Sequence, residues 1–107
     1  MYKYERDVLD RITSRLREKF QDRIVAVYAF GSKVRGDYDD RSDFDILIVV
    51  KDRDPDTEHK IIDIFVEEEV RNDLFFSTVI KDYAVFEKEK GMNSPFYQNI
   101  AKEGVAF

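Results

Sequence analysis

Two short apolar runs around a polar segment constrain this chain more than any other feature. The first run, residues 24–30, stops at Gly31-Ser32, and the second opens with two aspartates one residue apart, Asp43 and Asp45. Because alternate side chains of a strand share one face, we expect the two carboxylates side by side, roughly 7 Å apart at the backbone. A carboxylate pair can bind a divalent cation, and a turn of small residues can hold a phosphate. The stretch therefore predicts a site for a metal–nucleotide complex.

Length and composition favour a small globular protein. The chain has 107 residues, 43% of them hydrophobic, which predicts a single domain over residues 1–107. The absence of cysteine excludes disulfides and thiolate metal sites, and it fits a cytoplasmic location. The N-terminal residues are charged, with no apolar signal segment, and the longest apolar run has seven residues, so no membrane span is expected.

The charge pattern bears on possible partners. The formal net charge is −5, acids and bases are interspersed, and the densest charge clusters, residues 37–45 and 52–58, are acidic. A protein that binds nucleic acid through the phosphate backbone usually carries a basic face. The sequence therefore argues against nucleic acid as a partner and favours a protein.

The periodicity of apolar residues predicts an α/β (or α+β) protein. Residues 4–20 carry one apolar stripe at helical spacing, and short runs rich in β-branched residues predict strands at 24–30, 44–50 and 74–80. Further helices are expected from the Asp54-Pro55 start to residue 70, over 83–90, and over 95–103 between Ser94 and Gly104. Only about 13 residues join the first two strands, which is short for a parallel crossover. We expect a small mixed β-sheet with helices packed against it.

Two familiar loop motifs do not fit this segment. Residues 31–36 read GxxxxG, but Asp37 and Tyr38 follow where a P-loop needs Lys and then Ser or Thr. An EF-hand starting at Asp37 would need Gly at its sixth position and Glu at its twelfth, and these are Ser42 and Ile48.

An ordinary explanation stays open beside the functional one. Gly31-Ser32 can be a simple turn and residues 37–45 a solvated acidic loop. Asp45 argues against this reading, since it stands between Phe44 and Ile46 in a strand of core residues. A buried carboxylate is costly unless it meets a metal or a cation.

The spacing of these residues resembles a known signature. Gly31-Ser32, then residues 35–37 (RGD), then residues 42–45 (SDFD) are similar to the GSxxRGD…SDxD pattern of nucleotidyltransferases related to DNA polymerase beta. The length and element order resemble the minimal nucleotidyltransferases, over essentially all 107 residues. The resemblance implies the nucleotidyltransferase fold.

It also implies roles for five residues. Gly31 and Ser32 would bind the phosphates of a nucleotide, and Asp43 and Asp45 would be catalytic and would hold Mg²⁺. Arg35 would either neutralise phosphate charge or form a surface salt bridge, and the sequence leaves both open.

The chain departs from the family pattern at one position. Active members carry a third carboxylate on a later strand, and the aligned position here is Ser77. No Asp or Glu occurs between Leu74 and Ile80. A serine hydroxyl is neither a base at neutral pH nor a charged metal ligand.

The resemblance predicts a nucleotidyltransferase that binds Mg²⁺ with a nucleoside triphosphate, in the first place ATP, and transfers a nucleotidyl group to a hydroxyl. Similar proteins pair with a HEPN ribonuclease toxin and act as its antitoxin by adding AMP to a tyrosine. The alternative is a catalytically impaired binding module that neutralises its partner by contact. Transfer to a small molecule is a third reading, but such relatives usually carry a further substrate domain.

Overall fold

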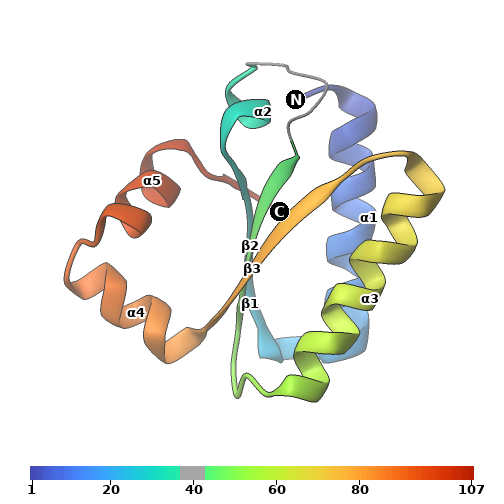
Figure 1. The fold of residues 1–107 in the computed structure, drawn as a ribbon. Helices are drawn as coiled ribbons and strands as arrows, with labels where there is room; N and C mark the ends of the chain where they lie inside the picture. The colour runs from blue at the N-terminus through green and yellow to red at the C-terminus, as the bar shows by residue number, and fades with distance from the viewer. Residues whose placement is uncertain (37–42) are drawn as a thin grey trace.

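A mixed sheet of four strands organises the molecule. The computed structural model describes residues 1–36 and 43–107, and its strands are β1 Ile24–Phe30, β2 Phe44–Val50, β3 Phe76–Asp82 and β4 Val105–Ala106. Their order in the sheet is β3-β2-β1-β4 (Figure 1). β1 pairs antiparallel with both β2 and β4, whereas β2 and β3 run parallel. The expected small mixed sheet is confirmed, and β4 is an addition that the sequence patterns did not predict.

Helices cover both faces of this sheet. They are α1 Lys3–Phe20, the short α2 Ser32–Arg35, α3 Pro55–Asn72, α4 Tyr83–Gly91 and α5 Pro95–Glu103, with a 3₁₀ turn at Gln21–Arg23. In Figure 1, α1 and α3 lie on one side of the sheet, and α4 and α5 lie on the other. No helix within the described ranges is long and apolar enough to cross a membrane.

Local capping sets the helix boundaries that the sequence predicted. The Asp54 carboxylate accepts a hydrogen bond from the Thr57 amide at 2.9 Å, and Pro55 follows at the first helical position of α3. Ser94 accepts from the Tyr97 amide at 3.1 Å at the start of α5, and that helix ends at Gly104. These predicted helix ends are confirmed.

β2 lies at the centre of two apolar layers. Its even-numbered residues, from Phe44 to Val50, pack with the buried residues of α1 and α3. Leu47 and Val49 point to the opposite face, where they pack with Phe86 of α4 and Ile100 of α5. This alternation also places Asp45 on the α4–α5 face.

The predicted bounds of the third strand, residues 74–80, are wrong by two residues at each end. β3 begins at Phe76 because it is Phe76 that pairs with Phe44, the first residue of β2, and it continues to Asp82, which pairs with Val50. The last two residues of β3 are charged, and one of them, Lys81, is stabilised by an ion pair with Glu89 of α4 at 2.5 Å. Pairing with β2, rather than local hydrophobicity, sets the limits of this strand.

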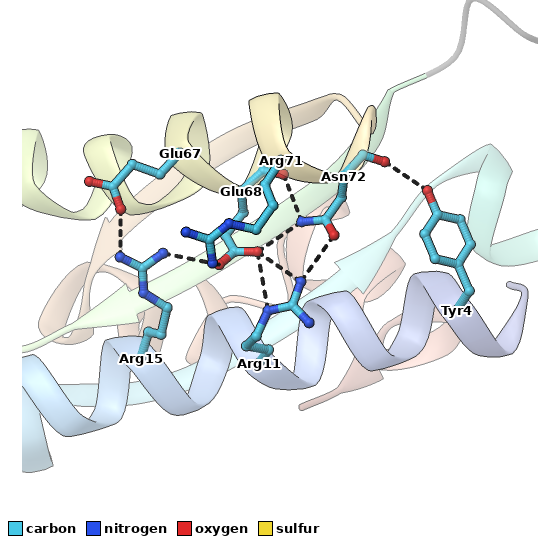
Figure 2. A network of polar contacts seen from close by, with 7 residues as sticks. All are labelled: Tyr4, Arg11, Arg15, Glu67, Glu68, Arg71 and Asn72. Carbon is cyan, nitrogen blue, oxygen red and sulfur yellow. Dashed lines mark hydrogen bonds and ion pairs between the residues drawn. The ribbon is translucent and has the colours of Figure 1, made fainter.

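A buried carboxylate joins α1 to α3 (Figure 2). The side chain of Glu68 is fully buried, and its Oε2 accepts hydrogen bonds from Arg11 Nη2 at 2.9 Å and from Asn72 Nδ2 at 2.8 Å. Its Oε1 accepts from Arg15 Nη1 at 3.0 Å. Burial raises the pKa of Glu68, but the hydrogen bonds from Arg11, Asn72 and Arg15 outweigh it and leave the pKa below its ordinary value.

Candidate functional site

The end of β1 meets the start of β2 at a very close contact. Phe30, the last residue of β1, pairs with Asp45, and Gly31 follows with φ +90°. A Cβ atom at Gly31 would overlap Oδ2 of Asp45, and L-residues rarely adopt this φ. Glycine is therefore required here, because it lets the carboxylate lie directly against the turn. Ser32 begins α2 at the same place.

The two aspartates differ in their surroundings. Asp45 is half-buried on the α4–α5 face, whereas Asp43 is exposed immediately before β2. Burial raises the pKa of Asp45, the negative charge of Asp43 raises it further, and the positive charge of Arg35 lowers it. None of the described residues donates a hydrogen bond to the Asp45 carboxylate, so no such bond offsets the cost of its burial.

This donor set fits a hard divalent cation. Carboxylate oxygens are the preferred protein ligands of Mg²⁺, and a bound cation would favour the ionised form that burial and Asp43 disfavour. Among residues 1–36 and 43–107, no group of three or more His, Cys, Asp or Glu side chains could hold a metal. The residues present therefore offer two carboxylates for such an ion.

Ser77 completes a row across three strands. In the parallel register of β2 and β3, Ser77 lies directly beside Asp45, which in turn pairs with Phe30. Paired residues of neighbouring strands share a face, so Ser77 and Asp45 face the same side. The position aligned with the third carboxylate of the resembling family is thus next to Asp45, and it holds an exposed hydroxyl.

Arg35 connects the turn to α5. Its Nη1 lies 2.9 Å from Oε2 of Glu103, so the surface salt bridge that the sequence left open is present. The positive charge of Arg35 also lowers the pKa of Asp45. Contact with phosphate stays a prediction for this residue. Neighbouring Lys33 makes a cation–π contact with Phe44, with its Nζ 5.0 Å from the ring centroid.

Two aromatic residues near this row are ones that the sequence assigns to the core by default. Phe96 of α5 packs edge-on against Phe30, with ring centroids 5.8 Å apart, and so covers the sheet beside Asp45. Phe75, just before β3, is 60% exposed, and its carbonyl accepts a hydrogen bond from the Phe44 amide at 3.0 Å. Aromatic residues of a small domain are expected in the core by default, and no local pattern distinguishes an exposed one.

The candidate site is therefore a glycine turn, a carboxylate pair and an adjacent strand at one end of a mixed sheet. The family model described as "Nucleotidyltransferase domain" matches residues 9–104. The chain belongs to this nucleotidyltransferase family and is one of its minimal members.

Individual relatives agree with this assignment. The chain is 30% identical over 100 residues to a Methanocaldococcus jannaschii protein named "Putative protein adenylyltransferase", and the match covers 94% of both chains. A crystal structure of a "putative nucleotidyltransferase" from Sulfolobus solfataricus is similar with a TM-score of 0.55 and 26% identity, over 94% of this chain and 77% of that one. A toxin–antitoxin crystal structure with AMP-PNP shares the fold, with a TM-score of 0.56 and 17% identity, over 90% of this chain and 69% of that one.

Proposed function

We propose that this protein transfers a nucleotidyl group from a Mg²⁺-bound nucleoside triphosphate, ATP in the first place, to a hydroxyl of a partner protein. The observation that carries the proposal is the close approach of Gly31 and Asp45, which brings the glycine turn against a carboxylate whose pKa burial and Asp43 raise. The family assignment and the adenylyltransferase name of the M. jannaschii relative support the reaction class.

Each residue of the site has a role in this proposal. Because Gly31 has no side chain of its own, its backbone would approach a phosphate closely, and Ser32 offers an amide and a hydroxyl to the same group. Asp43 and Asp45 hold the Mg²⁺, which when bound neutralises triphosphate charge and polarises the reacting phosphorus. Arg35, whose positive charge lowers the pKa of Asp45, adds a cation on the phosphate side.

The reaction is an in-line displacement at the α-phosphorus. The acceptor oxygen forms a bond to this phosphorus while the bond to pyrophosphate breaks, and the hydroxyl proton leaves. Because Ser77 stands where the resembling family has a carboxylate, the proton passes to solvent water and not to a carboxylate of β3 beside Asp45. We expect slow transfer as a consequence, since positioned general-base catalysis typically contributes about 10²–10⁴-fold.

The biological role that we propose is that of an antitoxin. The partner would be a HEPN-family toxin whose tyrosine hydroxyl receives AMP. The fold shared with a toxin–antitoxin protein that was crystallised with AMP-PNP supports this role. The acidic character of the chain, with its net charge of −5, supports a protein acceptor over a nucleic acid.

One observation favours a second candidate function. With a serine beside Asp45, the site lacks the carboxylate that would activate an acceptor hydroxyl. A protein of this kind can bind nucleotide and neutralise its partner by contact alone, without transfer.

Calorimetric titration tests the metal-bridged site. ATP is titrated into the protein with Mg²⁺ and then with EDTA, and we expect affinity to be at least about tenfold weaker in EDTA. Asp45→Asn should remove the difference, while Asp63→Asn, which changes an exposed aspartate of α3, should leave it intact. Equal ATP affinity of the wild type in Mg²⁺ and EDTA would rule the site out.

Label transfer separates the two candidates. The protein is incubated with ATP labelled at the α-phosphate and with the partner toxin. A covalent label on the toxin supports the enzyme, whereas protection from the toxin without any label supports the contact-only module.

A further inference from the structure

An apolar stripe lies exposed on the flank of α3. Ile62, Val66 and Val70 follow one another at four-residue spacing, so their side chains form a continuous row along one side of the helix. All three are exposed, Val70 to 83%. The buried residues of α3 lie on a different side of the helix, because they include Ile61, Ile64 and Phe65. The stripe is therefore unused by the core.

The flank of α3 that carries the stripe lies beside the start of β3. Glu69, one residue before Val70, accepts a hydrogen bond from the Phe76 amide at 3.2 Å, so this flank of α3 reaches the strand. Phe76 pairs with Phe44 in the sheet. Exposed Phe75 and exposed Asp43 are the residues that directly precede this pair. We call the exposed side chains of Ile62, Val66, Val70 and Phe75 the α3–β3 patch.

The direction of the proposed reaction points to the same side of the sheet. In an in-line displacement, the attacking oxygen approaches the phosphorus opposite to the leaving group. The proposed phosphate turn, Gly31-Ser32, is at β1, and the carboxylates are on β2. The acceptor therefore approaches from the β3 side, and β3 is the edge strand whose first residue is hydrogen-bonded to Glu69 of α3.

The charge around the patch defines what can cover it. Asp63 and Glu69 lie three residues before and after Val66, on either side of the row, and α3 as a whole carries six carboxylates and two cations. A second copy of this acidic chain would bring like charges together. A partner with an apolar contact surface bordered by Lys and Arg would complement it.

From these observations we propose that the α3–β3 patch is the docking surface for the acceptor protein, and that this acceptor presents an apolar surface rimmed by basic residues. The inference rests on the proposed function for the direction of attack. The apolar row supplies the contact, the acidic rim orients the partner, and Phe75 connects the docked surface to the carboxylate pair.

Two valines make a matched test. Val66 on α3 is 48% exposed, and Val85 on α4, across the sheet from α3, is 50% exposed (Figure 1). The probe is the purified protein encoded by the neighbouring gene, and its affinity for each variant is measured by calorimetry. We expect Val66→Asp to lose at least tenfold in affinity and Val85→Asp to stay within threefold of the wild type. Val70→Ser, at the most exposed position, gives a second variant with little effect on folding.

Several results would overturn the docking surface. These are equal losses in Val66→Asp and Val85→Asp, no change in Val66→Asp and Val70→Ser, or no binding of the neighbour-encoded protein by the wild type. Sedimentation that shows a dimer of the chain alone, dissociated by Val66→Asp, would assign the patch to a second copy instead.

The same variants separate this inference from the proposed function. Val66→Asp should keep the wild-type affinity for Mg²⁺–ATP while losing the partner. Asp45→Asn should keep the partner while losing label transfer. If the wild type binds the partner through the patch but transfers no label, the docking surface is supported and the proposed transferase activity is wrong.

Discussion

Burial raises the pKa of both Glu68 and Asp45, but the final pKa shifts of these two carboxylates have opposite directions. Glu68, between α1 and α3, is fully buried and meets Arg11, Arg15 and Asn72, which lower its pKa below the ordinary value despite burial (Figure 2). Asp45, on the other face of the sheet, is only half-buried, yet burial and the neighbouring Asp43 raise its pKa.

The difference distinguishes a structural charge from a charge kept for a ligand. The protein itself supplies the donors that Glu68 needs, so this carboxylate contributes to the contact between two helices. The Asp45 carboxylate lies against the backbone of Gly31, and a second negative charge, Asp43, lies two residues away in the sequence. A site that disfavours its own ionised carboxylate is stabilised when a cation binds, and perturbed carboxylates of this kind are typical of functional sites.

The largest effect is expected when the structural carboxylate is removed. Glu68→Ala should lower the free energy of unfolding by about 2–4 kcal/mol, because it leaves Arg11, Arg15 and Arg71 without their shared partner and opens a small void. Glu67→Ala is the matched control, since Glu67 also pairs with Arg15 but is 57% exposed. It should cost less than about 1 kcal/mol. Urea unfolding of both variants measures the difference.

The same pair of variants has a pH signature. Because the pKa of Glu68 is lowered in the folded state, its contribution to stability is present above the ordinary glutamate pKa of about 4.3 and is lost as the pH falls through the folded value. The gap between wild type and Glu68→Ala should therefore narrow in acid. A gap that is constant from neutral pH to pH 3 would show that packing, and not the charge, carries the effect.

The next effect concerns the contact that defines the site. Gly31→Ala should destabilise the protein by about 1–3 kcal/mol and weaken Mg²⁺–ATP binding, since the new Cβ would displace the Asp45 carboxylate. Gly36→Ala is the control, because Gly36 has a similar φ of +87° but open space around its Cβ position. Thermal unfolding and calorimetry of both variants separate backbone strain from the contact. Equal loss of ATP affinity in both would show that the contact with Asp45 is unimportant.

Much of the fold could be predicted because its signals are local. Helical periodicity located α1, and the cap residues Asp54, Ser94 and Gly104 set helix ends, since each acts on a backbone group a few residues away. The bounds of β3 and the existence of β4 depend on pairing with distant strands. A pattern confined to a few neighbouring residues contains no such information.

The candidate site shows the same division. The family resemblance identified Ser77 as the position of the missing carboxylate, whereas its place beside Asp45 follows from the parallel register of β2 and β3. The partner of Glu68 could not be found, since Arg11 and Arg15 lie more than 50 residues away in the sequence. Nor did the pattern distinguish Glu68 from its neighbours Glu67 and Glu69. Ile62, Val66 and Val70 follow the same helical spacing as the buried residues of α3, and this spacing alone does not say which side of a helix the sheet covers.

The smallest expected effect is on stability at Asp45, where removing the charge should stabilise the protein instead of destabilising it. Because burial and Asp43 raise its folded pKa, the ionised side chain costs stability as the pH rises above the ordinary aspartate value of about 3.9. Without metal, Asp45→Asn should therefore be as stable as the wild type in acid and slightly more stable at neutral pH, by less than about 1 kcal/mol. Thermal unfolding with EDTA and Asp63→Asn as control measures this.

Added Mg²⁺ should reverse the order of the two proteins. A ligand that binds only the folded state stabilises it by RT ln(1 + [L]/Kd), so saturating Mg²⁺–ATP raises the stability of the wild type and leaves Asp45→Asn nearly unchanged. Glu68→Ala lacks no part of the site, so it should gain as much from the ligand as the wild type gains. If Asp45→Asn gained equally, the ligand would bind without this carboxylate, and Asp45 would then be, like Glu68, a charge without a role in binding.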